Sequence, residues 1–200
     1  MTKISNRSLS PSRLEAFSDG VFSIAITLLV LELHIPRVQD GELSESLLSD
    51  WPSYLSYFVS FFSIGITWVN HHGLFDRIKA TSRTLLFLNL GLLLGVATIP
   101  FTTSLASSWL QTPSGSTLAV ALYCLNWALI ALMFIAILRY LLNNNELYEA
   151  EFSSIFKEES KRGKVGISLY ILASLISLMS PILAICICLI MCIWFVFAPQ

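Results

Sequence analysis

Residues 13–33 read RLEAFSDGVFSIAITLLVLEL, and this stretch decides how the rest of the chain is interpreted. A helix of about 20 residues, rising about 1.5 Å per residue, crosses the hydrocarbon core of a bilayer. The first two turns nevertheless carry Arg13, Glu15, Ser18 and Asp19. Ionisable side chains at membrane depth normally face a protein interior or a water-filled path. We therefore expect a transmembrane helix that lies inside a helical bundle.

The two sides of this helix differ. At about 100° per residue, one narrow stripe of the helix consists of bulky apolar side chains, apart from the arginine at its start. Thr27 lies beside this stripe, whose members are Arg13, Phe17, Ile24, Leu28 and Leu31. Ser18 and Asp19 point to the other side. Because hydrogen-bonding groups in a membrane need protein partners, the side that carries Ser18 and Asp19 should pack against other helices, while the apolar stripe is available to line something.

The composition of the whole chain is that of an integral membrane protein. Of its 200 residues, 55% are hydrophobic and 12% are charged, and the mean hydropathy is +0.72. Soluble domains carry about 25% charged residues. The net charge is −1 and the basic residues are scattered over several loops, which gives no case for a nucleic-acid partner. Membrane lipid is the expected surrounding.

The apolar segments predict an all-α membrane protein with six transmembrane helices in a single domain, 1–200. The expected helices cover 12–35, 51–72, 82–105, 117–142, 163–180 and 181–198. The last two would form one helix of about 50 Å, too long for a single span, so a turn at Ser180 and Pro181 is favoured over one kinked segment. The polar segment 143–164 is expected to be a soluble linker.

Basic residues predict the orientation of the bundle. With six spans and both termini in the cytoplasm, Arg37 is the one basic residue outside. The cytoplasmic side then holds the remaining eleven of the twelve: Lys3, Arg7, Arg13, Arg77, Lys79, Arg83, Arg139, Lys157, Lys161, Arg162 and Lys164. Cytoplasmic loops carry this excess in multi-pass proteins. We expect a multi-pass protein of the plasma membrane.

Polar side chains from three predicted helices lie at similar depth near the cytoplasmic face. The first helix contributes the pattern R-x-x-x-F-S-D (Arg13, Phe17, Ser18, Asp19), the second ends in Trp68, Asn70, His71 and His72, and the third contains Asn89. Asp19 can accept a hydrogen bond from an indole, an imidazole or an amide, and Arg13 can donate several. The simplest interpretation is a polar network that ties these helices together.

A second interpretation makes Asp19, His71 and His72 metal ligands or an acid–base set. Zinc requires three or four converging ligands, and adjacent residues point about 100° apart on a helix, so at most one of the two histidines readily joins Asp19. The four cysteines have no zinc-site spacing. The chain also lacks paired carboxylates, a nucleophile with its base and a phosphate-binding glycine loop. We expect no metal, no cofactor and no enzymatic activity.

The R-x-x-x-F-S-D pattern opening the first helix, together with W-x-N-H-H (Trp68–His72) ending the second, resembles the transmembrane protein 175 potassium channel family in its bacterial six-helix form. The resemblance implies a homotetramer whose first helices line a central pore. It places the pore constriction at Ile24, further apolar rings at Leu28 and Leu31, and hydroxyls near the constriction at Ser23 and Thr27. It also implies that Arg13, Phe17, Ser18 and Asp19 hold helices together within and between subunits, with Trp68, His71 and Asn89 as partners.

Such a pore would work without a carbonyl filter. The chain has neither a T-V-G-Y-G segment nor an arginine-rich voltage sensor, whereas a ring of isoleucines can gate by dewetting. Partial dehydration at that ring would favour K⁺ over Na⁺ modestly. The predicted function is therefore a potassium-preferring cation channel. The alternative is a proton- or cation-coupled secondary transporter that uses Asp19 with His71 and His72.

Overall fold

The structure, a computed structural model, describes residues 10–33, 42–112 and 115–197. Within these ranges the chain is helical, and its only strand-like pairing is the isolated bridge between Ile78 and Tyr148. The α-helices are α1 (Pro11–Leu28), α2 (Leu43–Ser49), α3 (Trp51–Phe75), α4 (Arg83–Ala97), α5 (Ile99–Trp109), α6 (Ser116–Leu142), α7 (Ser153–Ile176) and α8 (Pro181–Phe197). Short 3₁₀ turns are η1 (Leu29–Glu32), η2 (Asn145–Leu147) and η3 (Ala150–Phe152).

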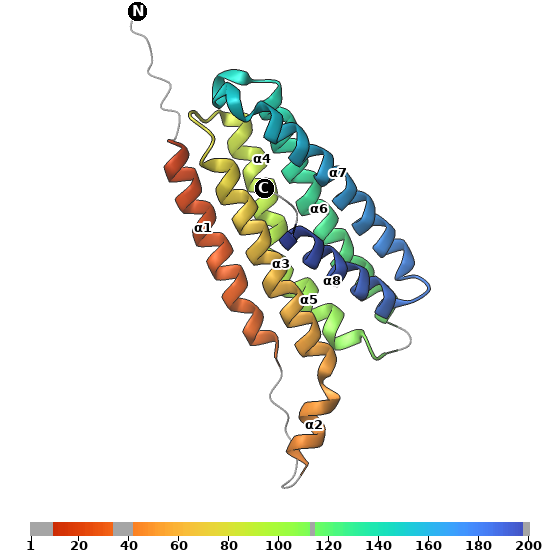
Figure 1. The fold of residues 1–200 in the computed structure, drawn as a ribbon. Helices are drawn as coiled ribbons and strands as arrows, with labels where there is room; N and C mark the ends of the chain where they lie inside the picture. The colour runs from red at the N-terminus through yellow and green to blue at the C-terminus, as the bar shows by residue number, and fades with distance from the viewer. Residues whose placement is uncertain (1–9, 34–41, 113–114, 198–200) are drawn as a thin grey trace, which may run out of the picture.

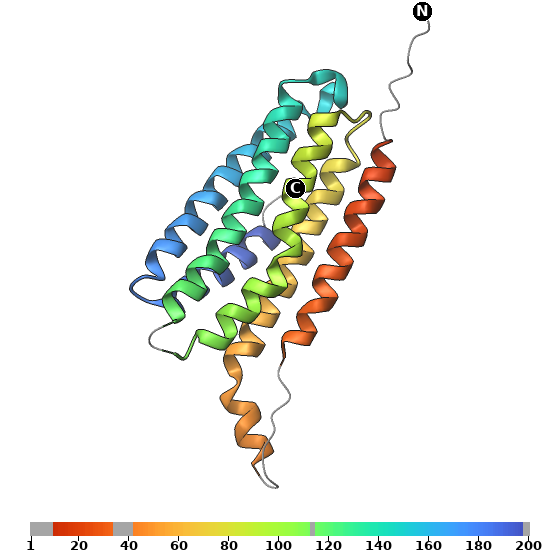
Figure 2. The same cartoon turned by 180° about the vertical axis from the view of Figure 1, so that it is seen from behind.

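The long helices form an elongated bundle (Figure 1). Helix α1 lies at one edge and packs on α3 and α4, while α6 and α7 pack against each other on the opposite side. Helix α6 also contacts α4 and α5. Helix α8 crosses the bundle obliquely, as the reverse view confirms (Figure 2). The edge position of α1 leaves one of its sides without a neighbour in the part of the protomer that the structure describes.

The predicted span 82–105 consists of two helices, α4 and α5, which meet at Thr98. Pro100 has no backbone N–H, so a continuous helix would lose a hydrogen bond there. Asn126 of α6 bonds to the chain beside the break: its Nδ2 donates to the Gly95 carbonyl oxygen at 3.2 Å and its Oδ1 accepts from Thr98 Oγ1 at 3.0 Å. The break is therefore fastened to α6 by side-chain hydrogen bonds.

Helix α7 begins at Ser153, well before the predicted start near residue 163. The polar segment 143–164 was expected to be a linker because of its mixed charge. Its apolar side chains are buried instead, with Tyr148 1% exposed and Phe156 fully buried. The Lys79 backbone N–H donates to the Leu147 carbonyl oxygen at 2.9 Å. Burial of these apolar side chains beneath the charged surface explains why α7 begins earlier than predicted.

The other boundaries differ less from the predicted ones. Helix α3 continues to Phe75, beyond the predicted end at residue 72, and α2 lies between the first two predicted helices, where no helix was predicted. The predicted first helix, 12–35, is helical through Glu32, and its last two residues lie outside the described residues. Among the described residues, three helical segments have the length and apolar composition of a membrane span, namely Pro11–Glu32, Arg83–Trp109 and Ser116–Leu142. The six-span topology stays a prediction.

Candidate pore helix and its anchoring network

The packed face of α1 follows the helical repeat. Side chains spaced three or four residues apart are at most 5% exposed, and they are Leu14, Ser18, Phe22, Ala25 and Leu29. Positions three and four apart lie on one side of a helix, and this side meets α3 and α4. The only polar member of the buried row is Ser18, which is fully buried.

The opposite face of α1 carries the apolar stripe singled out in the sequence. The exposed fraction is 53% for Phe17, 61% for Ile24, 41% for Leu28 and 74% for Leu31. Arg13 is also exposed and has no polar partner in the described part of the chain. The described residues of one protomer therefore leave this stripe uncovered over the length of the helix.

Two hydroxyls lie beside the stripe, on Ser23 and Thr27, and both are exposed. Ser23 Oγ donates to the Gly20 carbonyl oxygen at 3.0 Å, and Thr27 Oγ1 lies 2.9 Å from the carbonyl oxygens of Ser23 and Ile24. A hydroxyl whose proton is engaged with its own helix keeps its oxygen lone pairs free to accept. These two positions thus offer oxygen acceptors to whatever faces α1.

The buried side of α1 is anchored by a three-residue hydrogen-bonded network across α1, α3 and α4. Asn89 Nδ2 donates to Ser18 Oγ at 2.9 Å, and His71 Nε2 lies 2.9 Å from Asn89 Oδ1. All three side chains are fully buried. Ser18 Oγ in turn donates to the Leu14 carbonyl oxygen at 2.9 Å. Hereafter these three residues are called the anchor.

The partners determine the protonation pattern of His71. Asn89 Oδ1 can only accept, so His71 Nε2 carries the hydrogen and donates. His71 Nδ1 is buried without a hydrogen-bond partner among the described residues. The ring stacks on Phe75 at a centroid distance of 4.2 Å and tilts against Phe22 at 5.3 Å. The His71 ring thus contacts an aromatic side chain of α1 and another of α3 while its Nε2 bonds to α4.

A second set of contacts joins α1 and α3 at the edge of the bundle. Trp68 Nε1 donates to Asp19 Oδ1 at 2.9 Å, and His72 Nδ1 lies 2.6 Å from Glu15 Oε1. His72 Nε2 is 3.6 Å from Asp76 Oδ2. The Trp68 and His72 rings stack with centroids 5.9 Å apart. These contacts are more exposed than the anchor, so solvent weakens them.

The residues considered as a metal or acid–base set have different partners. Asp19 accepts from Trp68, His71 donates to Asn89, and His72 lies between Glu15 and Asp76. Glu15, His72 and Asp76 have ligand atoms within 4.8 Å of one another, but both nitrogens of the His72 imidazole already face carboxylates.

Glu15 was not predicted from the sequence as a partner of His72, although its i, i+4 spacing from Asp19 indicated that both lie on the same side of α1. Asn70 does not join these contacts and instead lines a cavity between α3, α6, α7 and α8.

Comparison with known proteins identifies the family. Residues 13–100 match the family described as "Endosomal/lysosomal potassium channel TMEM175". A potassium channel from Chamaesiphon minutus is 36% identical over 187 residues, which cover 92% of each chain. This chain belongs to the TMEM175 family of ion channels. Membership in the TMEM175 family, inferred from the R-x-x-x-F-S-D and W-x-N-H-H patterns, is thereby confirmed, and its members are channels rather than enzymes.

Other TMEM175 relatives support the same assignment. A potassium channel from Streptomyces collinus is 44% identical over 138 residues, covering 68% of this chain and 67% of that protein. The crystal structure of a lysosomal potassium-selective channel TMEM175 homologue from Chamaesiphon minutus superposes with a TM-score of 0.83 at 35% identity, covering 93% of this chain. The human endosomal/lysosomal proton channel TMEM175 is 34% identical over 125 residues, and this match covers a quarter (25%) of the human protein.

Proposed function

We propose that this chain is a potassium-preferring cation channel in which four copies of α1 surround a central pore. Ile24 forms the constriction and hydrophobic gate, and Leu28 and Leu31 form wider apolar rings. Both termini lie in the cytoplasm, six segments cross the membrane, and the protein resides in the plasma membrane. Permeant K⁺ is the only ion the proposal requires.

The observation that carries the proposal is the contrast between the two sides of α1. One side is fastened by the buried anchor of Ser18, His71 and Asn89, whereas Ile24 on the other side is 61% exposed. A helix held rigidly on one side can present the other side at a fixed position. Four-fold symmetry would bring the same exposed stripe of each copy to one axis.

The chemistry of the exposed side suits a gated cation path. A ring of Ile24 side chains would exclude water when narrow and so close the pore without a plug. When wider, it would require partial dehydration of the ion, which costs less for K⁺ than for the more strongly hydrated Na⁺. The free lone pairs of Ser23 and Thr27 could replace part of the lost hydration. Selectivity from such a pore is modest.

The test is a recording from purified protein in planar bilayers under K⁺ and Na⁺ gradients. Ile24→Asn should hydrate the constriction and raise the K⁺ conductance. It should also shift the reversal potential, measured under K⁺ and Na⁺ gradients, toward the value of a channel that does not discriminate between the two ions. Leu132→Asn is the matched control, because Leu132 is an exposed apolar residue (45%) on α6, and it should retain the wild-type reversal potential. Wild-type currents in Ile24→Asn would contradict the role given to Ile24.

The transporter alternative can be tested in the same preparation. It would require Asp19, His71 and His72 to exchange ions or protons, yet His71 is fully buried and donates to Asn89. A channel should sustain fluxes far above an ordinary enzyme turnover of about 10³ per second. Because animal relatives are named proton channels, the recordings should include a pH gradient. A K⁺ flux that strictly requires the proton gradient would favour the transporter.

A further inference from the structure

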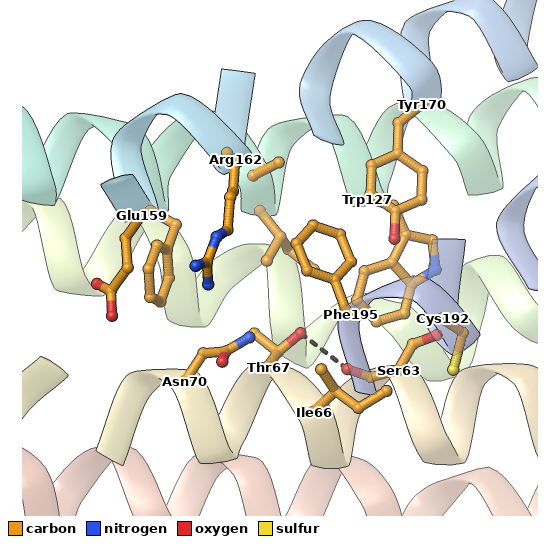
Figure 3. Close-up of a pocket in the computed structure, with 14 residues that line it drawn as sticks. Ser63, Ile66, Thr67, Asn70, Trp127, Glu159, Arg162, Tyr170, Cys192 and Phe195 are labelled. Atoms are coloured by element: carbon orange, nitrogen blue, oxygen red, sulfur yellow. Dashed lines mark hydrogen bonds between the residues drawn. The ribbon is translucent and has the colours of Figure 1, made fainter. Parts of the chain in front are cut away.

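A partly open cavity of about 110 Å³ lies between helices of the bundle, on the side of α3 away from α1. Its walls come from α3, α6, α7 and α8 (Figure 3). The candidate pore residues on α1 take no part in it. A ligand site in this cavity is therefore independent of the channel proposal.

Most of the cavity wall is aromatic or aliphatic. Trp127 and Phe134 of α6 and Phe195 of α8 line it, together with Ile66 of α3. The Trp127 and Tyr170 rings stack with centroids 6.2 Å apart and planes 22° from parallel. Ligand sites of small molecules are mainly apolar walls with a few placed polar groups. This lining suits the flat or chain-like body of an apolar molecule.

Two neutral polar side chains facing this cavity, in addition to the buried Oε2 atom of Glu159, have no hydrogen-bond partner among the described residues. Tyr170 is 6% exposed, and its hydroxyl, directed toward Trp127 and Phe195 in Figure 3, makes no hydrogen bond with any described residue. The partly buried Asn70 amide also lacks a partner within the described ranges. Buried polar groups are almost always hydrogen-bonded. A molecule in the cavity would satisfy a hydroxyl that the protein leaves unpaired.

The charges near the Asn70 end select against an ionised occupant. Glu159 and Arg162 of α7 both line this end of the cavity. Arg77 Nη1 lies 3.3 Å from Glu159 Oε1, so this carboxylate oxygen is paired, whereas Glu159 Oε2 is buried without a hydrogen-bond partner among the described residues. Groups of opposite sign side by side favour neither a cationic nor an anionic head group. A neutral group that both donates and accepts matches Asn70 and Tyr170.

We propose that this cavity is a binding site for a small neutral amphiphile with one hydroxyl group, of the size of a phenol. An engineered cavity of about 150 Å³ lined by apolar side chains binds benzene, so 110 Å³ accommodates one ring after slight adjustment of the walls. The ring would lie among Trp127, Phe134 and Phe195. Its hydroxyl would bond to the Tyr170 hydroxyl, with the Asn70 amide at the other end of the cavity.

The test uses 4-bromophenol, because bromine quenches tryptophan fluorescence at short range and Trp127 lines the site. The full-length protein in detergent should show a saturable quenching component. Tyr170→Phe keeps the ring and removes only the hydroxyl, so half-saturation should need about tenfold more ligand, the factor that about 1.4 kcal/mol represents. In the wild type, 4-bromotoluene, which lacks the hydroxyl, should bind about tenfold more weakly than 4-bromophenol.

A filled cavity provides the second arm of the test. Ala131 lines the cavity, so Ala131→Phe should remove the saturable component. Ala97→Phe adds the same ring at an exposed position on α4 and should leave the curve unchanged. Equal, non-saturating quenching in the wild type and in Ala131→Phe would mean partition into detergent only and would overturn the site. Equal affinities for the phenol and the toluene, or an unchanged Tyr170→Phe, would overturn recognition of the hydroxyl.

Discussion

Helices α1 and α6 are both long and apolar enough to cross a membrane, yet they are packed very differently. In the most apolar window of each, 28% of the residues are buried in α1 and 56% in α6. Helix α6 contacts α4, α5, α7 and α8, whereas α1 rests mainly on α3 and α4. Hydropathy alone does not distinguish a central helix from one that keeps a free face.

The polar side chains distinguish the two helices. In α1, Ser18 bonds to Asn89 on the packed side, and the opposite stripe is uncovered. In α6, Asn126 bonds to the Gly95 carbonyl oxygen and to Thr102 Oγ1, while other sides of the helix also pack. In both helices a buried polar residue marks the face that is fastened to a neighbour. The opposite side of α1, which carries the exposed apolar stripe, is available for contact with another subunit.

The largest effect should come from removing the anchor while keeping its volume. Asn89→Leu leaves the buried His71 Nε2–H without an acceptor, which should lower the free energy of unfolding by about 1–3 kcal/mol. Because Asn89 fastens α1, the amides of residues 14–25 should exchange hydrogen faster. Hydrogen exchange with mass spectrometry measures this.

Asn126→Leu is the matched control for that experiment. It removes a buried asparagine (8% exposed) that fastens the α4–α5 break to α6. Exchange should then increase around residues 95–102 while α1 keeps its protection. Loss of protection in α1 to the same degree in both variants would contradict the division of roles between Asn89 and Asn126.

A comparable effect on assembly is expected at the exposed stripe. Phe17 is 53% exposed in the protomer, and the proposed tetramer would cover it. Phe17→Ala should weaken association by about 2 kcal/mol, the cost of truncating a well-packed interface aromatic, without lowering protomer stability. Native mass spectrometry should show smaller species. Phe101→Ala, which truncates a 66% exposed phenylalanine on α5, should remain assembled; equal behaviour of the two variants would remove Phe17 from the interface.

A smaller effect is expected where α1 and α3 meet at the exposed edge. His72→Gln removes the contact with Glu15, whose side chain is 19% exposed while that of His72 is 48% exposed. Exposed ion pairs contribute about 0–1 kcal/mol, so the thermal unfolding midpoint should change little. Glu158→Gln, which breaks a pair within α7, is the control. A loss as large as that of Asn89→Leu would place the main fastening of α1 at His72 instead of the anchor.

The smallest effect should be a change in pH dependence at Glu159. Burial raises the pKa of Glu159, although Arg77 and Arg162 oppose the shift. The native state therefore holds this proton to higher pH than the unfolded state, whose pKa is about 4.3. Unfolding free energy falls as pH rises from there through the native pKa, and then levels.

The unfolding free energy of Glu159→Gln should not fall with rising pH in this way, because glutamine does not titrate. Unfolding midpoints measured from pH 4 to pH 7 should show a wild-type advantage at the acidic end that shrinks as pH rises. Glu151→Gln, at an exposed position without a partner in the described part of the chain, should follow the wild type. Parallel curves for the wild type and Glu159→Gln would contradict the role of burial.

Much of the arrangement of α1 could be predicted from its sequence, because polar groups in a membrane must face protein. The wheel placed Ser18 opposite Ile24, and in the structure the first is fully buried and the second is 61% exposed. Asp19 was expected to accept from an indole, an imidazole or an amide, and it accepts from Trp68. The pattern on a single helix was sufficient for this.

Features that depend on distant packing could not be predicted in the same way. Which histidine joins Asn89 depends on the rotation of α3. The residue pattern alone presents His71 and His72 equally, and only the family resemblance singled out His71, which is the one that contacts Asn89. Helix α7 begins early because Phe156 finds a buried site, which the surrounding charges obscured. The cavity beside Tyr170 results from four helices meeting, and no local pattern encodes it.

The central claim is that the Ile24 side chains of four subunits meet at one axis within the ion path. Cd²⁺ added to Ile24→Cys channels in a bilayer tests it directly, because thiolates brought together at an axis bind this soft metal. The account predicts that Cd²⁺ blocks the K⁺ current through Ile24→Cys and leaves the wild type and Leu132→Cys unaffected. Robust Ile24→Cys currents that Cd²⁺ does not change would contradict it.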